Sequence, residues 1–547
     1  MLFSKDVLLV VCPMWGTCLP PMGVAYIAAY LEDKGVPCDV QDMNIALYAA
    51  ASADDKRLWQ MENFHLWSQE RLFTTIRDKF SGAIEASAQR IVDQKYNIAG
   101  FSLNGANILF SIEMAKAIRR KSPDIRIVFG GASCNFLHRH PRMPFRFLTS
   151  STDTASLLPE GVVDLIVMGE GEEAFLEIVA AYKAGTAVTR AGVVPATVHS
   201  CEMIQLPPYI ADLDALPFPA WEKLPLEKYE VQGELPMIFS RGCINRCAFC
   251  NDWRMWNGRF RSRSAKNIFA EIKALHDRFG KKTFRCNDLL FNGNLKVLDE
   301  LTDLIIGSGL KINWTAQGVV RTDMKVELLR KLKKSGMTTI IYGVESLADN
   351  VLEKMGKPFT FADIQIMLKR TKEAGINTWI NLIMGFPGET EEDFQITKRR
   401  LEEVRDYLDT VSSLNPCNIT AATDLEISPE KFGIVFPPDK DWCEGWETAD
   451  GRNTLEIRKR RAQEIFKYLR SLRIQTNFVG IYDGDSPSQD RTALKKAAPV
   501  VKPAWGRSFR RVFHLPVVFF ILVYHFLLAL YLQALKFFRK TIIFPGG

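Results

Sequence analysis

Hydrophobic residues in the first 190 positions gather in short unbroken runs, with stretches of helical spacing between them. Such runs are typical of strands in a parallel sheet buried on both faces, and they cover residues 7–11, 37–42, 98–102, 125–129 and 163–167. The helical stretches cover residues 24–34, 108–121 and 172–183. This alternation predicts an α/β domain with a doubly wound, Rossmann-like sheet over residues 1–190. Residues 50–92 interrupt it and predict a helical insertion packed by its own aromatic side chains.

The same alternation returns after a Pro-rich linker at residues 191–235. A strand precedes Cys243, and further strands are expected at residues 283–287, 312–316, 338–342, 379–384 and 410–414. Helical spacing covers residues 265–279, 295–308, 325–334, 361–374 and 391–407. These patterns predict about six strand–helix units between residues 236 and 425, followed by a helical region at 426–475 that covers the open side of this domain.

The last part of the chain differs in composition. Residues 476–511 read as a linker, and residues 512–547 form a nearly continuous apolar and aromatic segment with basic residues on both sides. A helix of that length, at about 1.5 Å per residue, can cross a hydrocarbon core of about 30 Å or lie along its surface. We therefore expect a helical tail that attaches the protein to a membrane, with the choice between spanning and lying on it left open.

Composition narrows the class of protein. The chain has 547 residues, 47% of them hydrophobic and 24% charged, which is typical of a multidomain globular protein. The net charge of +7 forms no stripe of basic and aromatic residues, so no nucleic-acid partner is expected. Eleven cysteines without a recognisable signal peptide indicate a reducing compartment. We expect a cytoplasmic protein held at the inner membrane through its C-terminal helix.

Three cysteines stand close together directly after a predicted strand. Cys243, Cys247 and Cys250 are spaced so that one short loop presents three thiolates, the usual ligands of iron–sulfur clusters. Three ligands suit a 4Fe-4S cluster that keeps one iron open. The alternatives are a zinc knuckle, which would need a fourth ligand nearby, and buried thiols without a metal.

The cysteine spacing, with Phe249 before the last cysteine, resembles the signature of radical S-adenosylmethionine (SAM) enzymes. In that family the open iron binds SAM, and reductive cleavage gives methionine and a 5′-deoxyadenosyl radical. The resemblance implies a partial (β/α)6 barrel over residues 236–425 with a 4Fe-4S cluster on the three cysteines. It further implies an electron donor of the flavodoxin or ferredoxin type.

Other residues at predicted strand ends match the same family, because barrel chemistry lies at the carboxyl ends of strands. Acidic and basic side chains suit the charged and polar groups of SAM, and glycine permits the backbone to approach SAM closely. The SAM contacts that the resemblance implies are Phe249, Asp288, Arg321, Glu345, Ser346 and Gly385. Solvated charges and helix caps are the alternative interpretation.

The loops after the strands of the N-terminal sheet resemble the cobalamin-binding domain that precedes many radical SAM cores. The cobalamin contacts that the resemblance implies are Pro13, Met14, Gly16, Ser102, Asn104, Gly130, Gly131, Gly169, Glu170, Gly171 and Glu172. The Asp-x-His-x-x-Gly motif of the wider cobalamin family is absent, and the first histidine is His65. The resemblance therefore implies cobalamin without a protein histidine on cobalt, or a domain that has lost cobalamin.

The resemblance implies a cobalamin-dependent C-methyltransferase that acts on an unactivated carbon. The apolar tail adds the expectation of a lipophilic small molecule, such as a lipid or a tetrapyrrole. One alternative is a radical SAM cyclase or rearrangement enzyme without methyl transfer. Another is a non-catalytic iron–sulfur binding protein, which would not need the SAM-pocket residues.

Overall fold

The computed structural model describes residues 5–60, 63–136, 146–147, 156–157, 161–196, 207–438, 440 and 442–477. The predicted membrane segment at residues 512–547 lies outside the described residues, as does the linker from residue 478 onward. Among the helices that the structure describes, none is long and apolar enough to cross a bilayer.

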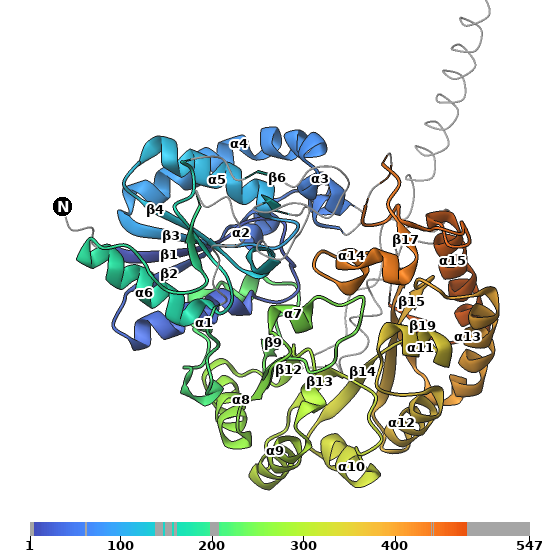
Figure 1. Cartoon of the computed structure of the whole chain (residues 1–547). Helices are drawn as coiled ribbons and strands as arrows, with labels where there is room; N and C mark the ends of the chain where they lie inside the picture. The colour runs from blue at the N-terminus through green and yellow to red at the C-terminus, as the bar shows by residue number, and fades with distance from the viewer. Residues whose placement is uncertain are drawn as a thin grey trace, which may run out of the picture. The chain divides into compact units, whose positions relative to one another are not determined.

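The N-terminal part is built on a six-stranded sheet with the order β2-β1-β3-β4-β7-β8, in which only β8 is antiparallel (Figure 1). Its strands are β1 (Lys5–Val11), β2 (Cys38–Asp42), β3 (Tyr96–Ser102), β4 (Arg126–Gly130), β7 (Leu165–Val167) and β8 (Val193–Pro195). A separate short antiparallel pair is formed by β5 (Arg146–Phe147) and β6 (Ser156–Leu157). The doubly wound sheet predicted from the apolar runs is therefore confirmed.

Helices cover both faces of this sheet because alternate strand residues bury on opposite sides. Val7, Leu9 and Val11 pack with α1 (Met22–Asp33) and α6 (Gly171–Ala184). Leu8 and Val10 pack on the other side, in a core with α2 (Met43–Ala50), α3 (Phe64–Ser68), α4 (Glu70–Asp93) and α5 (Ile108–Lys121). The helices α3 and α4 occupy the stretch where the sequence predicts an insertion.

The second part is an open sheet of seven parallel strands in the order β19-β16-β15-β14-β13-β12-β9 (Figure 1). Its strands are β9 (Glu234–Met237), β12 (Thr283–Cys286), β13 (Asn313–Gly318), β14 (Met337–Glu345), β15 (Asn377–Met384), β16 (Thr410–Pro416) and β19 (Gln475–Thr476). The outer layer contains α8 (Ala265–Phe279), α9 (Leu295–Ser308), α10 (Val326–Lys334), α12 (Phe361–Glu373) and α13 (Glu391–Val404). Six of the strands correspond to the six predicted units, so the partial barrel is confirmed, and β19 is an addition.

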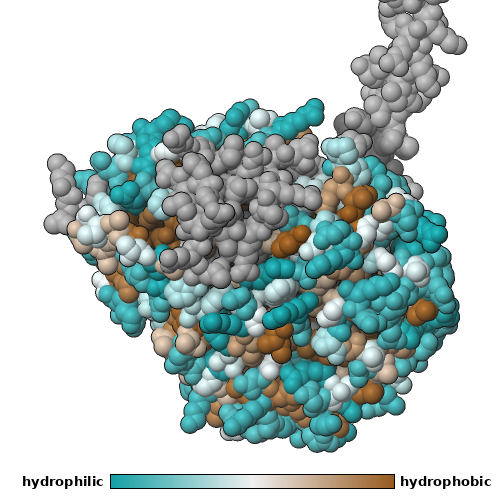
Figure 2. Space-filling view, viewed as in Figure 1, coloured by the Kyte–Doolittle hydropathy of each residue, from teal (hydrophilic) through white to brown (hydrophobic). Residues whose placement is uncertain are grey.

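Two smaller features complete the second part. The strands β10 (Ser240–Gly242) and β11 (Phe260–Ser262) form an antiparallel hairpin beside β9, and α7 (Asp252–Met255) lies in its connection. Beyond β14 and β16 lie α11 (Asp349–Met355) and α14 (Asp424–Ile427), and β17 (Ile434–Val435) pairs with β18 (Glu447–Thr448). On the face shown in Figure 2, hydrophobic side chains are scattered among hydrophilic ones.

The described part of the linker, residues 207–233, is anchored on both sides. The amide of Ala220 donates to the carbonyl of Ala25 at 3.1 Å, and the Tyr229 hydroxyl donates to Asp42 at 2.5 Å. On the barrel side, Asp214 accepts from the amide of Ser264 at 2.9 Å. The linker therefore holds the two sheets together.

The prediction that the region at 426–475 covers the open side of the barrel is wrong for its long helix. The helix α15 (Leu455–Ser471) buries Ala462, Ile465 and Leu469 in the same core as the outer helices. Its apolar stripe thus extends the outer helical layer, next to β16 and β19.

Removing the buried charge of Arg461 is expected to cost about 3–5 kcal/mol of folding stability, because it leaves Glu389 buried without its partner. The two side chains are 4% and 0% exposed and 2.9 Å apart. Burial raises the pKa of Glu389 from 4.5 to about 7, although Arg461 opposes the shift. Between pH 4.5 and about pH 7 the folded state holds a proton on Glu389 that the unfolded state lacks. The contribution of Glu389 to folding stability therefore falls as the pH rises toward 7.

We therefore expect Arg461→Met to lower the melting temperature more at about pH 8 than at about pH 5.5, where Glu389 can stay protonated. The matched control is Arg460→Met, which removes an exposed neighbouring charge with only a 3.8 Å contact to Glu391 and should change little. Equal losses in both variants, measured by thermal unfolding, would contradict the prediction.

Candidate functional site

The three predicted cluster cysteines lie in the connection of the β10–β11 hairpin. Cys243 follows β10 directly, and Gly242 before it has a φ of +94°, a conformation that favours glycine. A Cβ at Gly242 would overlap the carbonyl oxygen of Arg259 at the other end of the connection. The close approach of these two segments fixes where the cysteine loop (residues 243–250) leaves the hairpin.

Backbone contacts hold the cysteine loop at the carboxyl ends of the barrel strands. The amide of Ala248 donates to the carbonyl of Met355 at the end of α11 at 3.0 Å. The carbonyl of Ala248 accepts from the amide of Asp424 at the start of α14, also at 3.0 Å. Because α11 follows β14 and α14 follows β16, the loop sits at the end of the barrel where catalytic groups are found in this architecture.

The donor set of the loop suits a four-iron cluster better than a zinc ion. The thiols are free, and burial raises the pKa of all three, that of Cys250 to about 12. In the described part of the chain, no three His, Cys, Asp or Glu side chains gather around a single metal position. Zinc needs four ligands at about 2.0–2.3 Å from one point, whereas in a cluster each cysteine binds its own iron. Ile244 beside Cys243 is 60% exposed and leaves an apolar surface next to the thiols.

Glu345 lies close to the cysteine loop at the end of β14. Its φ of +70° is rare outside glycine, and such strain, about 1–3 kcal/mol, clusters at functional sites. Burial raises the pKa of its carboxyl, while Lys357 at 3.8 Å opposes the shift. The Lys357 ammonium also lies 5.3 Å from the centre of the Phe249 ring and opposes the rise in the pKa of Cys247 that burial causes. Lys357 is part of no recognised motif, and sequence reasoning missed it.

Asp288 supports the strand that leads to the cysteines. It is buried, and its carboxylate accepts from the amide of Phe239 at 2.8 Å and from the hydroxyl of Ser240. Burial raises the pKa of Asp288 to about 6. Both oxygens therefore bind the segment just before Cys243, so Asp288 positions that segment.

The other predicted SAM residues make contacts within the chain. Arg321 forms two hydrogen bonds to Asp323, at 2.8 and 2.6 Å, and donates to the carbonyl of Asn292 at 2.6 Å. Ser346 is buried beside Glu345. Gly385 has a φ of +74°, and a Cβ there would overlap the side chain of Arg458. Of this set, Phe249 belongs to the cysteine loop and Glu345 contacts it through Lys357, whereas Gly385 shapes a turn.

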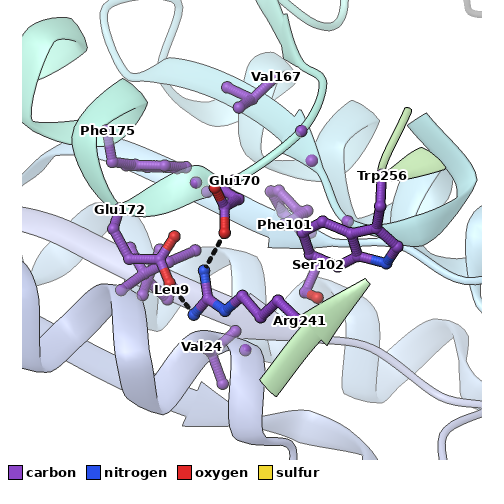
Figure 3. A pocket seen from close by; sticks show the side chains of 17 residues that line it. Leu9, Val24, Phe101, Ser102, Val167, Glu170, Glu172, Phe175, Arg241 and Trp256 are labelled. Atoms are coloured by element: carbon purple, nitrogen blue, oxygen red, sulfur yellow. Dashed lines mark hydrogen bonds and ion pairs between the residues drawn. The ribbon is translucent and has the colours of Figure 1, made fainter. Parts of the chain in front are cut away.

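A hollow partly open to solvent lies against the N-terminal sheet between α1 and α6 (Figure 3). The predicted cobalamin residues that line it are Ser102, Gly130, Gly131, Gly169, Glu170, Gly171 and Glu172. Leu9, Val24, Val167 and Phe175 make its walls apolar, and Trp256 from the barrel lies opposite Phe175. Apolar walls with a charged rim fit a ligand that has an apolar ring and polar edges.

Four predicted cobalamin residues do not line this hollow. Pro13 and Met14 are buried, and Met14 belongs to the core with α5. Asn104 accepts from the amides of Ala106 and Asn107, and so stabilises the turn before α5. Gly16 lines a different hollow, between the first loop and β12.

A buried ion cluster of Glu170, Glu172, Arg241 and Arg261 joins the rim of the hollow to the cysteine hairpin. Arg241 donates to Glu170 and to Glu172, each at 2.6 Å, and Arg261 donates to Glu170 at 2.8 Å. Burial alone would raise the pKa of Glu170, but the two arginines outweigh it and hold the pKa below its ordinary value. Sequence reasoning missed Arg241, although an arginine in a predicted buried strand signals a buried partner.

Part of the barrel matches a known protein family. Residues 237–401 match the radical SAM superfamily. The matched segment begins in β9, contains the three cysteines and Glu345, and ends in α13. The radical SAM segment thus covers the part of the chain that holds the cysteine loop.

Curated relatives match more than half of the chain. An uncharacterized methyltransferase, PH0819 of Pyrococcus horikoshii, is 27% identical over 307 residues, which cover 55% of this chain and 63% of the relative. The anaerobic magnesium-protoporphyrin IX monomethyl ester cyclase of Cereibacter sphaeroides is 28% identical over 328 residues, 58% of this chain and 50% of the relative. The chain thus spans between half and two thirds of the length of these relatives.

A solved structure extends the similarity of fold beyond the radical SAM segment. The radical SAM methyltransferase TsrM of Kitasatospora setae, solved with cobalamin and a [4Fe-4S] cluster, has a TM-score of 0.57 and 18% identity. The match covers 80% of this chain and 76% of that protein. The two proteins share the arrangement of a doubly wound domain followed by a partial barrel.

Proposed function

We propose that this protein is a cobalamin-dependent radical SAM enzyme, a C-methyltransferase that acts on an unactivated carbon. The observation that carries the proposal is the position of the cysteine loop, at the carboxyl ends of the radical SAM strands and joined through the ion cluster to the hollow of the doubly wound domain. The similarity to a fold solved with both cofactors supports it.

The chain's residues divide the work of holding the cofactors. Cys243, Cys247 and Cys250 would hold a 4Fe-4S cluster, and Glu345 would accept a hydrogen bond from SAM. The hollow would take cobalamin. When bound, the cluster would supply the electron for reductive cleavage of SAM, and cobalamin would carry the methyl group to be transferred. The side chains of Lys357 and Glu345 are 7% and 12% exposed and would help to exclude water from that end of the barrel.

The nature of the substrate is a separate part of the proposal. The prediction of a lipid or tetrapyrrole substrate and of membrane attachment rests on residues 512–547, outside the described residues. An electron donor of the flavodoxin or ferredoxin type supplies the reducing electron. The second candidate function is a cyclase without methyl transfer, which the similarity to a magnesium-protoporphyrin ester cyclase favours.

Product analysis tests the proposed function against the cyclase. The anaerobically reconstituted full-length protein is incubated with SAM carrying a deuterated methyl group, cobalamin, a strong reductant and candidate lipids and tetrapyrroles. Methyl transfer predicts S-adenosylhomocysteine and 5′-deoxyadenosine together, with the deuterated methyl group in the product. Deoxyadenosine with an unlabelled product and no S-adenosylhomocysteine would favour the cyclase instead.

A further inference from the structure

The hairpin that carries the cysteine loop needs an acidic partner outside itself. Arg241 and Arg261 face each other directly across β10 and β11. Like charges at directly opposed positions destabilise an antiparallel pair. Glu170 resolves this conflict, because one of its oxygens accepts from Arg241 and the other from Arg261. Glu170 therefore bridges the two opposed arginines of the hairpin from the N-terminal domain.

The acidic side of the cluster is fixed by a helix end. Glu170 directly precedes α6 and Glu172 lies in its first turn, where the helix dipole favours negative charge. Their side chains are 3% and 5% exposed, and that of Arg241 is 9% exposed. Because a buried charge without a partner is costly, movement of α6 must carry Arg241 with it or break the ion pairs of the ion cluster.

The ion cluster faces two sites at once. Glu170, Glu172 and Arg241 line the hollow, and their ion pairs cross its rim (Figure 3). Arg241 also stands two residues before Cys243, in the strand whose last residue fixes the exit of the cysteine loop. A ligand in the hollow would therefore lie beside Arg241, and an iron–sulfur cluster on the cysteines would lie beside the end of the same strand.

We infer that Arg241 is a positioning residue that couples occupancy of the hollow to the state of the cysteine loop. The inference rests on the proposed function for the identity of the two cofactors. Coupling between two ligands is reciprocal, so cluster assembly must change cobalamin affinity by the same factor as cobalamin changes cluster stability. In wild type this factor is expected to be about 5-fold or more.

The test measures the cobalamin dissociation constant of the full chain by absorbance titration, with the cluster assembled and after its removal by a chelator. Wild type should bind hydroxocobalamin at least about 5-fold more tightly in the cluster-loaded state. In Arg241→Met the two constants should agree within about 2-fold, and Arg241→Lys, which can pair with one glutamate, should recover part of the difference. The matched control is Arg259→Met, on the same hairpin but exposed and outside the ion cluster, which should keep the full difference.

Hydrogen exchange of residues 243–250 supplies a readout that needs neither cofactor. Arg241→Met should speed exchange there, while Arg259→Met should not. Three outcomes would each overturn the inference. They are unchanged hydrogen exchange in Arg241→Met, equal cobalamin dissociation constants for wild type with and without the iron–sulfur cluster, and a full difference between those two constants in Arg241→Met. Failure of wild type to bind cobalamin at all would overturn the proposed function and the coupling, whereas the positioning of the loop would still be decided by the exchange data.

Discussion

Replacing Cys247 with alanine is expected to abolish cluster assembly and, with it, reductive cleavage of SAM. Cys247 is the most enclosed of the three thiols, 8% exposed, and its loop offers no fourth cysteine as a substitute. Changes to groups that only support metal ligands cost about 10–100-fold, so loss of a ligand should exceed that range. Iron content, the absorbance of the reconstituted protein and deoxyadenosine formation measure the effect.

The control for this substitution is Cys134→Ala, which removes a buried free thiol in the N-terminal domain. It should retain the iron and the cleavage activity, at a modest cost in stability from the small cavity. If Cys247→Ala kept a full cluster and wild-type cleavage, the assignment of the cysteine loop would be wrong.

Replacing Gly242 with alanine is expected to remove most of the cluster while all three cysteines remain. The Cβ would overlap the Arg259 carbonyl oxygen, a backbone atom that cannot turn away as a flexible side chain could. The φ of +94° adds strain of about 1–3 kcal/mol. The hairpin must therefore open at the point where the cysteine loop leaves it, which separates Cys243 from the other two thiols.

Gly258 provides the comparison for Gly242. It lies in the same hairpin connection with a φ of +65°, but a Cβ there would approach only the Arg246 guanidinium, at 4.0 Å. Gly258→Ala should therefore lower stability by about 1 kcal/mol and leave the iron content unchanged. Similar iron contents in the two variants after reconstitution would show that the close approach at Gly242 does not position the loop.

The sequence predicts those features that depend on local pattern. Both sheets follow from alternating apolar runs and helical stretches, since buried parallel strands carry few polar residues. The sequence predicts the cysteine loop because its three cysteines lie within eight positions. A motif at a strand end predicts a role for Glu345, although nothing in the sequence indicates its strained backbone.

The remaining features depend on contacts between distant residues. Arg241 and Glu170 are 71 positions apart, so their ion pair has no local signature. The sequence predicts that Glu170 and Glu172 contact cobalamin but does not indicate that their carboxylates pair with Arg241 of the barrel part. The position of α15 is likewise not predicted by the sequence. Its apolar stripe indicates that the helix is buried, but not which side of the sheet it covers.

The most direct test of the central claim is formation of 5′-deoxyadenosine from SAM by the anaerobically reconstituted wild-type protein under a strong reductant, quantified by mass spectrometry. Radical SAM chemistry predicts deoxyadenosine that depends on the reductant and is absent from Cys247→Ala. A wild-type protein with an assembled cluster that neither binds SAM nor forms deoxyadenosine would contradict the proposal.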